Sequence, residues 1–267
     1  MMELSTAQYV VLLLAGASYG FTKTGILGLS ALVVPLMLCV FTPGQALGIA
    51  LPLLIFADIV ALIMLRKSVS WRNVAMALPW ALLGVFAGWR LLVRVQTMPA
   101  EAGDALLRRL VAGMVALVVV SGIIVRLYRS HSEDASKPPS VESEGKTTTA
   151  RYLFASLFAL IGGLVTMIAN NSGPAWVVHL MLFRMDKHHF LGTAAWIIFI
   201  LNVVKLPLSI QLGYVNMDTI KLNALMMPLV LVGLFAGRWV VDRVSQKWFD
   251  NSVQLCALLG ALYLLFF

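Results

Sequence analysis

Long apolar stretches separated by mostly short polar connections dominate the chain. About eight apolar blocks approach or exceed the length of a membrane span, and they cover residues 7–40, 45–65, 73–93, 108–126, 152–183, 190–213, 220–241 and 249–267. A spanning helix needs roughly 20 mostly apolar residues. The pattern therefore predicts an all-α, polytopic membrane protein.

One connection differs from the others in length and composition. Residues 130–150 have almost no apolar content and are rich in Ser, Thr, Pro and charge, which is typical of a flexible hydrophilic linker. The linker predicts a first membrane repeat over residues 1–129 and a second over residues 151–267.

The two halves resemble each other in sequence. The run GVFAGWRLLVRV from Gly84 matches GLFAGRWVVDRV from Gly233. Pro79 and Pro228 precede these glycines by the same distance. Internal symmetry of this kind is typical of transporter folds built from repeats.

A second register supports the same division. GIALPLLIFADIVAL from Gly48 aligns with GTAAWIIFILNVVKL from Gly192. This alignment sets Asp58 opposite Asn202. An acidic residue in the first half therefore corresponds to a neutral amide in the second.

The first and fifth blocks are too long for a single untilted span and contain helix breakers. They hold about 34 and 32 residues, against roughly 20 for one span. Glycines recur over residues 20–28 and 163–173, and a proline follows each region. Because Gly costs about 1 and Pro about 3 kcal/mol in a helix, both blocks should be interrupted. Matching interruptions in two halves indicate a transporter's substrate site.

The direction of the repeats depends on these interrupted blocks. If each block folds back, the repeats are inverted, and many cations share the cytoplasmic side in the connections at 66–72, 126–151, 184–189 and 238–250. The positive-inside rule favours that arrangement. Some cations would then lie on the opposite side: Arg90, Arg94, Arg108 and Arg109. If each block crosses once, the repeats are parallel.

Few charged residues lie inside the apolar blocks, and Lys23, Asp58 and Lys205 are the clearest. A charge at mid-span costs about 2.5–3.5 kcal/mol on insertion scales, so such residues are functional candidates. Lys23 is a candidate substrate ligand, whereas Lys205 could equally be a lysine that reaches the membrane interface. Asp58, opposite Asn202, either pairs with a lysine or carries a coupling proton.

Hydrogen-bond donors coincide with both interruptions. The candidate substrate-binding residues are Thr22, Lys23, Thr24 and Gly25 at the first, and Asn170, Asn171, Ser172 and Gly173 at the second. Exposed N-termini of half-helices offer N–H groups and a positive dipole end to an anion. The alternative is that the Asn and Ser side chains only form hydrogen bonds between helices.

Composition narrows the function classes. The chain is 60% hydrophobic and 12% charged, with a mean hydropathy of +0.91. Its net charge of +8 comes mostly from short connections, so membrane topology explains it better than nucleic-acid binding. Hydrolase, zinc-protease and nucleotide-binding motifs are missing, and the histidines match no metal-site spacing. We therefore expect no enzyme activity, metal or cofactor. An anion transporter is favoured, and an anion-selective channel is the alternative.

Three segments carry a resemblance to a known family. They are GFTKTGILG in the first block, LPLLIFADIVAL followed by a basic pair and VSW, and GGLVTMIANNSGP with DKHHFLGTAAWIIFILNVVKLP in the second half. Together they resemble the sulfite exporter TauE/SafE family over nearly the whole chain, most specifically over residues 162–207. The resemblance implies a secondary transporter of the bacterial inner membrane that moves sulfite, a sulfonate such as sulfoacetate, or a related organosulfur anion. Protons are a candidate coupling ion, and the oligomeric state stays open.

Overall fold

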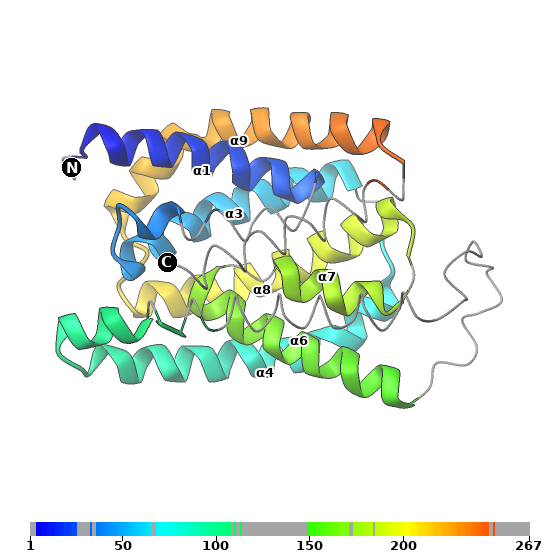
Figure 1. Ribbon diagram of the computed structural model, residues 1–267, viewed down its shortest axis with the longest axis horizontal. Coiled ribbons are helices and arrows are strands. Elements are labelled where there is room, and N and C mark those ends of the chain that lie inside the picture. Colours follow the sequence, from blue (N-terminus) through cyan, green and yellow to red (C-terminus); the bar gives the residue numbers. More distant parts are fainter. Residues whose placement is uncertain are drawn as a thin grey trace.

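The described residues of the protein form a bundle of helices. The computed structural model describes residues 4–25, 33, 36–65, 68–107, 109–110, 113, 149–170, 173–183, 185–245 and 248. Its main helices are α1 (Thr6–Thr24), α3 (Pro43–Leu65), α4 (Trp71–Gln96), α6 (Thr149–Ala169), α7 (Gly173–Met181), α8 (Lys187–Gln211) and α9 (Met217–Arg243) (Figure 1). The block expected at 249–267 and nearly all of the block at 108–126 lie outside the described residues. So does the expected linker, except that its last residues, from Thr149, begin α6.

The membrane class predicted from the sequence is confirmed. Five helices of the described part are long and apolar enough to cross a bilayer: α3, α4, the segment Arg151–Ala169 of α6, α8 and α9. Large apolar side chains face outward, as on α4 at Leu83 (57% exposed) and on α9 at Val232 (63% exposed). Outward apolar surface suits lipid as the surrounding solvent.

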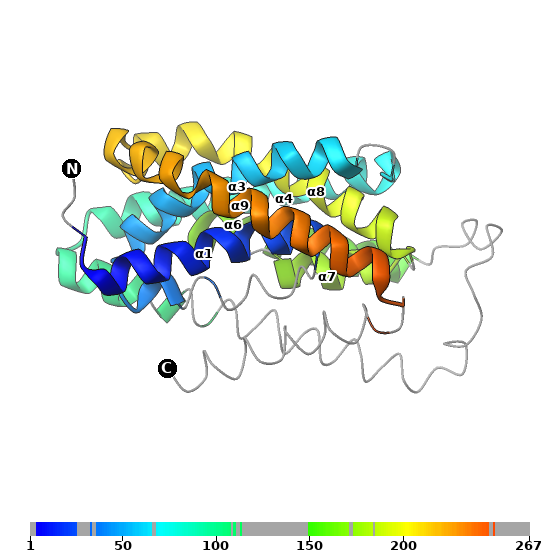
Figure 2. The same ribbon diagram turned by 90° about the horizontal axis from the view of Figure 1, so that it is seen from above.

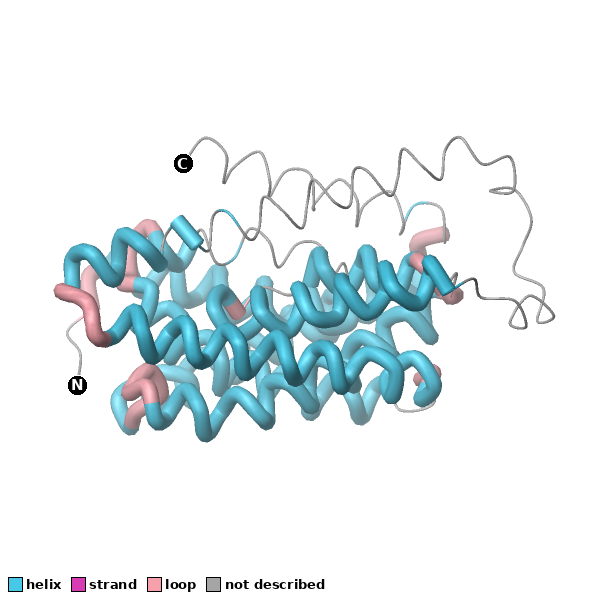
Figure 3. Tube along the Cα trace, turned by 90° about the horizontal axis from the view of Figure 1, so that it is seen from below, coloured by secondary structure: helices cyan, strands magenta, loops and turns pink. Residues whose placement is uncertain are grey.

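Six of the seven main helices of the described residues form three pairs, and α7 packs on α6. Helices α1 and α9 run along one long side, α4 and α6 along the other, and α3 and α8 lie between them (Figures 1 and 2). The view from below shows the same helices, with the described loops and turns at their ends (Figure 3). Each outer pair combines one helix from each half of the chain.

Local sequence signals place several helix ends. Ser5 and Gln8 form a capping box at the start of α1, and Asp186 and Asn216 cap α8 and α9 through their side chains. Side chains of this type satisfy N–H groups that a helix leaves unpaired at its first turn. The sequence therefore fixes these boundaries locally.

Contacts between helix ends define the direction of each helix. At one end of the bundle α3 and α9 finish while α4, α6 and α8 begin. Hydrogen bonds join this end: Arg72 to Tyr152, the Ser70 amide to Thr193, and Lys187 to the Val244 carbonyl. The opposite end is joined by bonds from Gln8 to the Val40 carbonyl and from Gln96 to the Leu212 carbonyl. Consequently α1 and α6, α3 and α8, and α4 and α9 run in opposite directions.

Glycines bring the backbones of each outer pair into contact. A Cβ atom on Gly20 of α1 or on Gly233 of α9 would lie only 2.0 Å from a carbonyl oxygen of the facing helix. The corresponding distances in the α4–α6 pair are 2.1 Å for Gly84 and 1.9 Å for Gly163. Small residues are what allow helices to approach this closely in a membrane. Each outer pair is thus a tightly packed unit.

Both overlong blocks are interrupted, as the sequence predicts. Helix α1 ends at Thr24 within the first block. In the fifth block α6 ends at Ala169, Asn170 takes a positive φ of 49°, and α7 starts at Gly173. Helix α7 folds back along α6, since the Trp176 ring lies within 3.1 Å of the Cβ position of Gly162.

Candidate functional site

A buried ion pair joins the end of α1 to the middle of α3. The Lys23 ammonium lies 2.6 Å from Oδ1 of Asp58. Lys23 is 7% exposed and Asp58 is fully buried. From the second half, Asn202 on α8 donates a hydrogen bond of 2.7 Å to Oδ2 of Asp58. The carboxylate is thereby held by both halves of the chain.

The second lysine, Lys205 on α8, has a different set of partners. Its ammonium donates to Thr166 Oγ1 at 3.0 Å, Asn170 Oδ1 at 2.5 Å and Asn202 Oδ1 at 3.1 Å. Lys205 is 1% exposed, so it does not reach the membrane interface. All three of its acceptors are electrically neutral groups. The interpretation of Lys205 as an interfacial lysine is therefore wrong.

Asn170 connects Lys205 to the break between α6 and α7. Its side-chain oxygen accepts from Lys205, and its amide donates to the Leu47 carbonyl of α3 at 3.0 Å. Three residues later Gly173 begins α7. The first N–H groups of a helix have no partner within the helix. The break therefore places a helix N-terminus close in sequence to a residue that contacts a buried cation.

We call this set of six residues the buried polar network: Lys23, Asp58, Thr166, Asn170, Asn202 and Lys205. Within the described part of the chain, the only buried Lys, Arg, Asp or Glu side chains are its three charged members. The network contains two lysines and one aspartate, so it has an excess of one positive charge when both lysines are protonated. Burying a charge without a counterion is costly. An anion is the partner that would complete the network.

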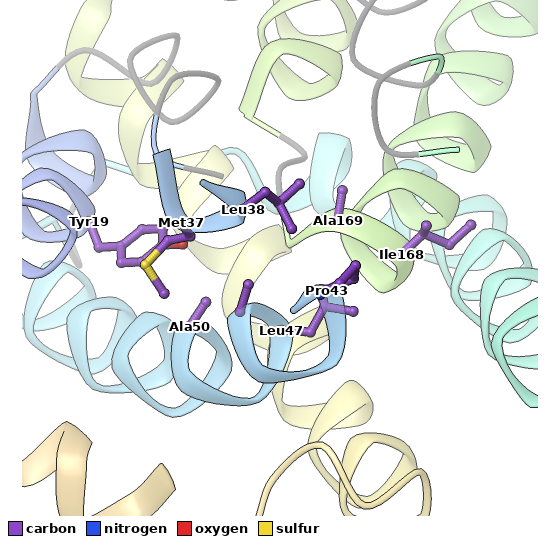
Figure 4. Close-up of a pocket in the computed structure, with 9 residues that line it drawn as sticks. Tyr19, Met37, Leu38, Pro43, Leu47, Ala50, Ile168 and Ala169 are labelled. Carbon is purple, nitrogen blue, oxygen red and sulfur yellow. The ribbon is translucent and has the colours of Figure 1, made fainter. Parts of the chain in front are cut away.

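A small apolar cavity adjoins the network (Figure 4). It contains about 280 Å³ of empty space, its open side included. Its lining comes from α1, α3, the end of α6 and the segment before α3: Tyr19, Met37, Leu38, Pro43, Ala46, Leu47, Ala50, Ile168 and Ala169. Because Ala169 precedes Asn170 and Leu47 accepts its hydrogen bond, the cavity lies beside the second break.

Some predicted site residues have other contacts. Thr22 donates to the Tyr19 carbonyl within its own helix. Thr24 donates to the Leu234 carbonyl of α9 at 2.6 Å, so it joins α1 to α9. Gly25 is the C-cap of α1 and packs closely against Phe21 and α9. These residues thus have partners outside the network that contains Lys23, whereas Asn171 and Ser172 lie outside the described residues.

Sequence reasoning missed Thr166. Gly20 and Gly163 occupy matching places in the two helix pairs, and Lys23 and Thr166 each follow by three residues. Aligning the two interrupted blocks on these glycines would therefore have singled out Thr166. Within the described residues no group of three His, Cys, Asp or Glu residues could hold a metal ion.

Outward apolar helices, two broken helices and a buried charged network define a membrane transporter rather than an enzyme. The family model "Sulfite exporter TauE/SafE" matches residues 12–264, and the chain belongs to this family of membrane transporters. No curated protein and no solved structure shows significant similarity to the chain.

Proposed function

We propose that the protein is a secondary transporter that exports a small organosulfur anion, such as sulfite or a sulfonate, across the bacterial inner membrane. The substrate binds between the buried polar network and the N-terminus of α7, near Asn170, Asn171, Ser172 and Gly173. The observation that carries this proposal is that Lys205 has only neutral hydrogen-bond partners, so that its protonated form gives the network an excess of one positive charge.

The chemistry of the site suits such a substrate. Sulfite and sulfonates present several acceptor oxygens together with negative charge, and charge-assisted hydrogen bonds are roughly twice as strong as neutral ones. Lys205 offers the charge, and the N-terminus of α7 offers N–H donors and a positive dipole end. The proposal therefore needs no metal or cofactor.

We further propose that residues 1–129 and 151–267 are inverted repeats. Three features support this: opposite directions of α1 and α6, of α3 and α8, and of α4 and α9; reciprocal glycine contacts; and matching breaks. The end where α4, α6 and α8 begin carries a cluster of cations: Arg72, Arg151, Lys187, Arg238 and Arg243. By the positive-inside rule, that end faces the cytoplasm.

Substrate counterflow in proteoliposomes tests the proposed function. Vesicles containing the purified protein are loaded with sulfite, sulfate, sulfoacetate, taurine or a carboxylate, and uptake of the same radiolabelled anion is followed. We expect at least one sulfur-containing anion to accelerate uptake from the opposite side. Ohmic current without acceleration would instead identify an anion-selective channel, and no flux of any anion would overturn the proposal.

A further inference from the structure

Every hydrogen-bond position of the Lys205 amine is matched by a neutral oxygen. Its partners are Thr166 Oγ1, Asn170 Oδ1 and Asn202 Oδ1 at 2.5–3.1 Å. An ammonium has three N–H donors, so the set satisfies it completely. It does not supply a negative charge, however, because the Asp58 carboxylate is held by Lys23 and Asn202.

The two amide oxygens cannot reverse their role. Asn170 uses its amide nitrogen on the Leu47 carbonyl, and Asn202 uses its own on Asp58, so both oxygens must face Lys205 as acceptors. Thr166 differs because a hydroxyl group can accept or donate. A neutral Lys205 amine would donate to both amides and accept from the Thr166 hydroxyl. The same three groups therefore satisfy the amine with or without its extra proton.

We propose that Lys205 takes up a proton when the anion binds and releases it when the anion leaves, so that anion and proton move together. This inference rests on the proposed function and adds its coupling ion. On binding, the lone pair of Nζ forms an N–H bond with a proton from water, and the Thr166 hydroxyl turns from donor to acceptor. On release, the same bond breaks and the proton returns to water.

Charge balance is the physical reason for the coupling. With a neutral Lys205, the empty network contains only the Lys23–Asp58 pair and has no net charge. With a bound monoanion and a protonated Lys205, it again has none, and with a bound dianion the proton on Lys205 reduces the imbalance from two negative charges to one. Either step without the other would leave an unpaired buried charge, which is unfavourable.

Other titratable groups around Lys205 already have partners or point elsewhere. Lys23 on α1 and Asp58 on α3 pair with each other. The contacts from α6 are the neutral Thr166 and Asn170. On α7, the ring of His179 lies against the Ala155 carbonyl at 2.8 Å. The arginines of α4, which also packs on α8, are exposed: Arg72, Arg90 and Arg94.

Proton uptake on binding is the direct test. Sulfoacetate, sulfate and methanesulfonate are each titrated into the purified full-length protein near neutral pH, where all three are fully ionised. The titration is repeated by calorimetry in buffers of different ionisation enthalpy. Because proton and anion binding are thermodynamically linked, we expect the wild type to take up about one proton per anion. Binding without proton uptake would overturn the inference and leave the proposed function standing, whereas no binding by any anion would contradict both.

Two variants assign the proton to its residue. Lys205→Gln keeps a neutral hydrogen-bonding side chain but cannot titrate, and we expect its residual anion binding to proceed without proton uptake. Lys221→Gln removes an exposed lysine of α9 and should retain the wild-type uptake. Unchanged proton uptake in Lys205→Gln would overturn the assignment. If Lys205→Gln fails to fold, the wild-type measurement still decides whether a proton accompanies the anion.

Discussion

The two buried lysines lie beside corresponding helix breaks but in different electrical surroundings. Lys23, at the end of α1, has a carboxylate at 2.6 Å. Lys205, beside the break between α6 and α7, has three neutral oxygens. The first break is therefore balanced within the protein, whereas a protonated Lys205 at the second has no negative hydrogen-bond partner among the described residues. The halves share a sequence pattern, but under the proposed function the second supplies the substrate's charge partner.

The largest expected effect comes from breaking the balanced pair. Asp58→Asn leaves Lys23 buried without a counterion, which costs about 3–5 kcal/mol. We expect a strong loss of folded protein, measured as membrane abundance and as detergent-solubilised protein on size-exclusion chromatography. Adding Lys23→Met should restore abundance, because it removes the unpaired charge. A well-folded Asp58→Asn protein whose transport has lost only its dependence on protons would assign the coupling proton to Asp58. That result would contradict the comparison of the two lysines.

The next effect concerns the packing that positions Thr166. A Cβ on Gly163 would lie 1.9 Å from the Ala81 carbonyl oxygen, so Gly163→Ala forces α6 away from α4. Overpacking of this kind costs about 1–3 kcal/mol. We expect a lower thermal unfolding temperature and weaker anion binding, because Thr166 would move relative to Lys205. Gly113→Ala is the matched control, since no atom lies within 4 Å of its Cβ position. Equal effects of both changes would refute the packing argument.

A third change makes the second lysine resemble the first. Asn170→Asp gives Lys205 a carboxylate partner in place of an amide oxygen and loses the hydrogen bond to the Leu47 carbonyl. Asp tolerates the positive φ of 49° at this position. The network then has no excess charge. We expect anion affinity to fall at least about tenfold, or roughly 1.4 kcal/mol, while the protein still folds. Undiminished affinity would show that the excess charge does not attract the substrate.

The smallest effect lies outside the network, at the start of α8. Burial tends to raise the pKa of Asp186, but hydrogen bonds with His189 and the His188 amide outweigh it and lower that pKa below its usual value. A carboxyl with a lowered pKa contributes stability at neutral pH that is lost as the pH falls through that pKa. Asp186→Ala should thus cost about 1 kcal/mol at neutral pH, as expected for a lost N-cap. The difference from wild type in thermal unfolding should shrink below about pH 4, and anion affinity should stay unchanged. If the difference in thermal unfolding temperature stays constant across that pH range, the charged Asp186 cap is not its cause.

Much of this architecture follows from sequence pattern. Apolar block length predicts the membrane class, and the glycines and prolines predict the two breaks, because both residue types destabilise a helix. The alignment of Asp58 with Asn202 places opposite each other two residues that form a hydrogen bond in the structure. These features depend on local composition and internal similarity, and both can be recognised in a single sequence.

The partners of each buried side chain were harder to foresee. Sequence alone left Asp58 free to pair with either lysine, and only the packing of α1 against α3 selects Lys23. Thr24, a predicted substrate ligand, donates to α9, because the close approach at Gly233 and Gly237 brings that helix within reach. A side chain's neighbours across helices depend on helix rotation and distance, which hydrophobic pattern does not specify.

The most direct test of the central claim compares anion affinity with and without the second lysine. Sulfite, sulfate, sulfoacetate and taurine are titrated into the wild type, Lys205→Gln and the control Lys221→Gln, each shown to be folded by size-exclusion chromatography. We predict that at least one sulfur-containing anion binds to the wild type and the control equally, and at least about tenfold more weakly to Lys205→Gln. Equal affinity in all three proteins, or no binding in any, would contradict an anion site built around Lys205.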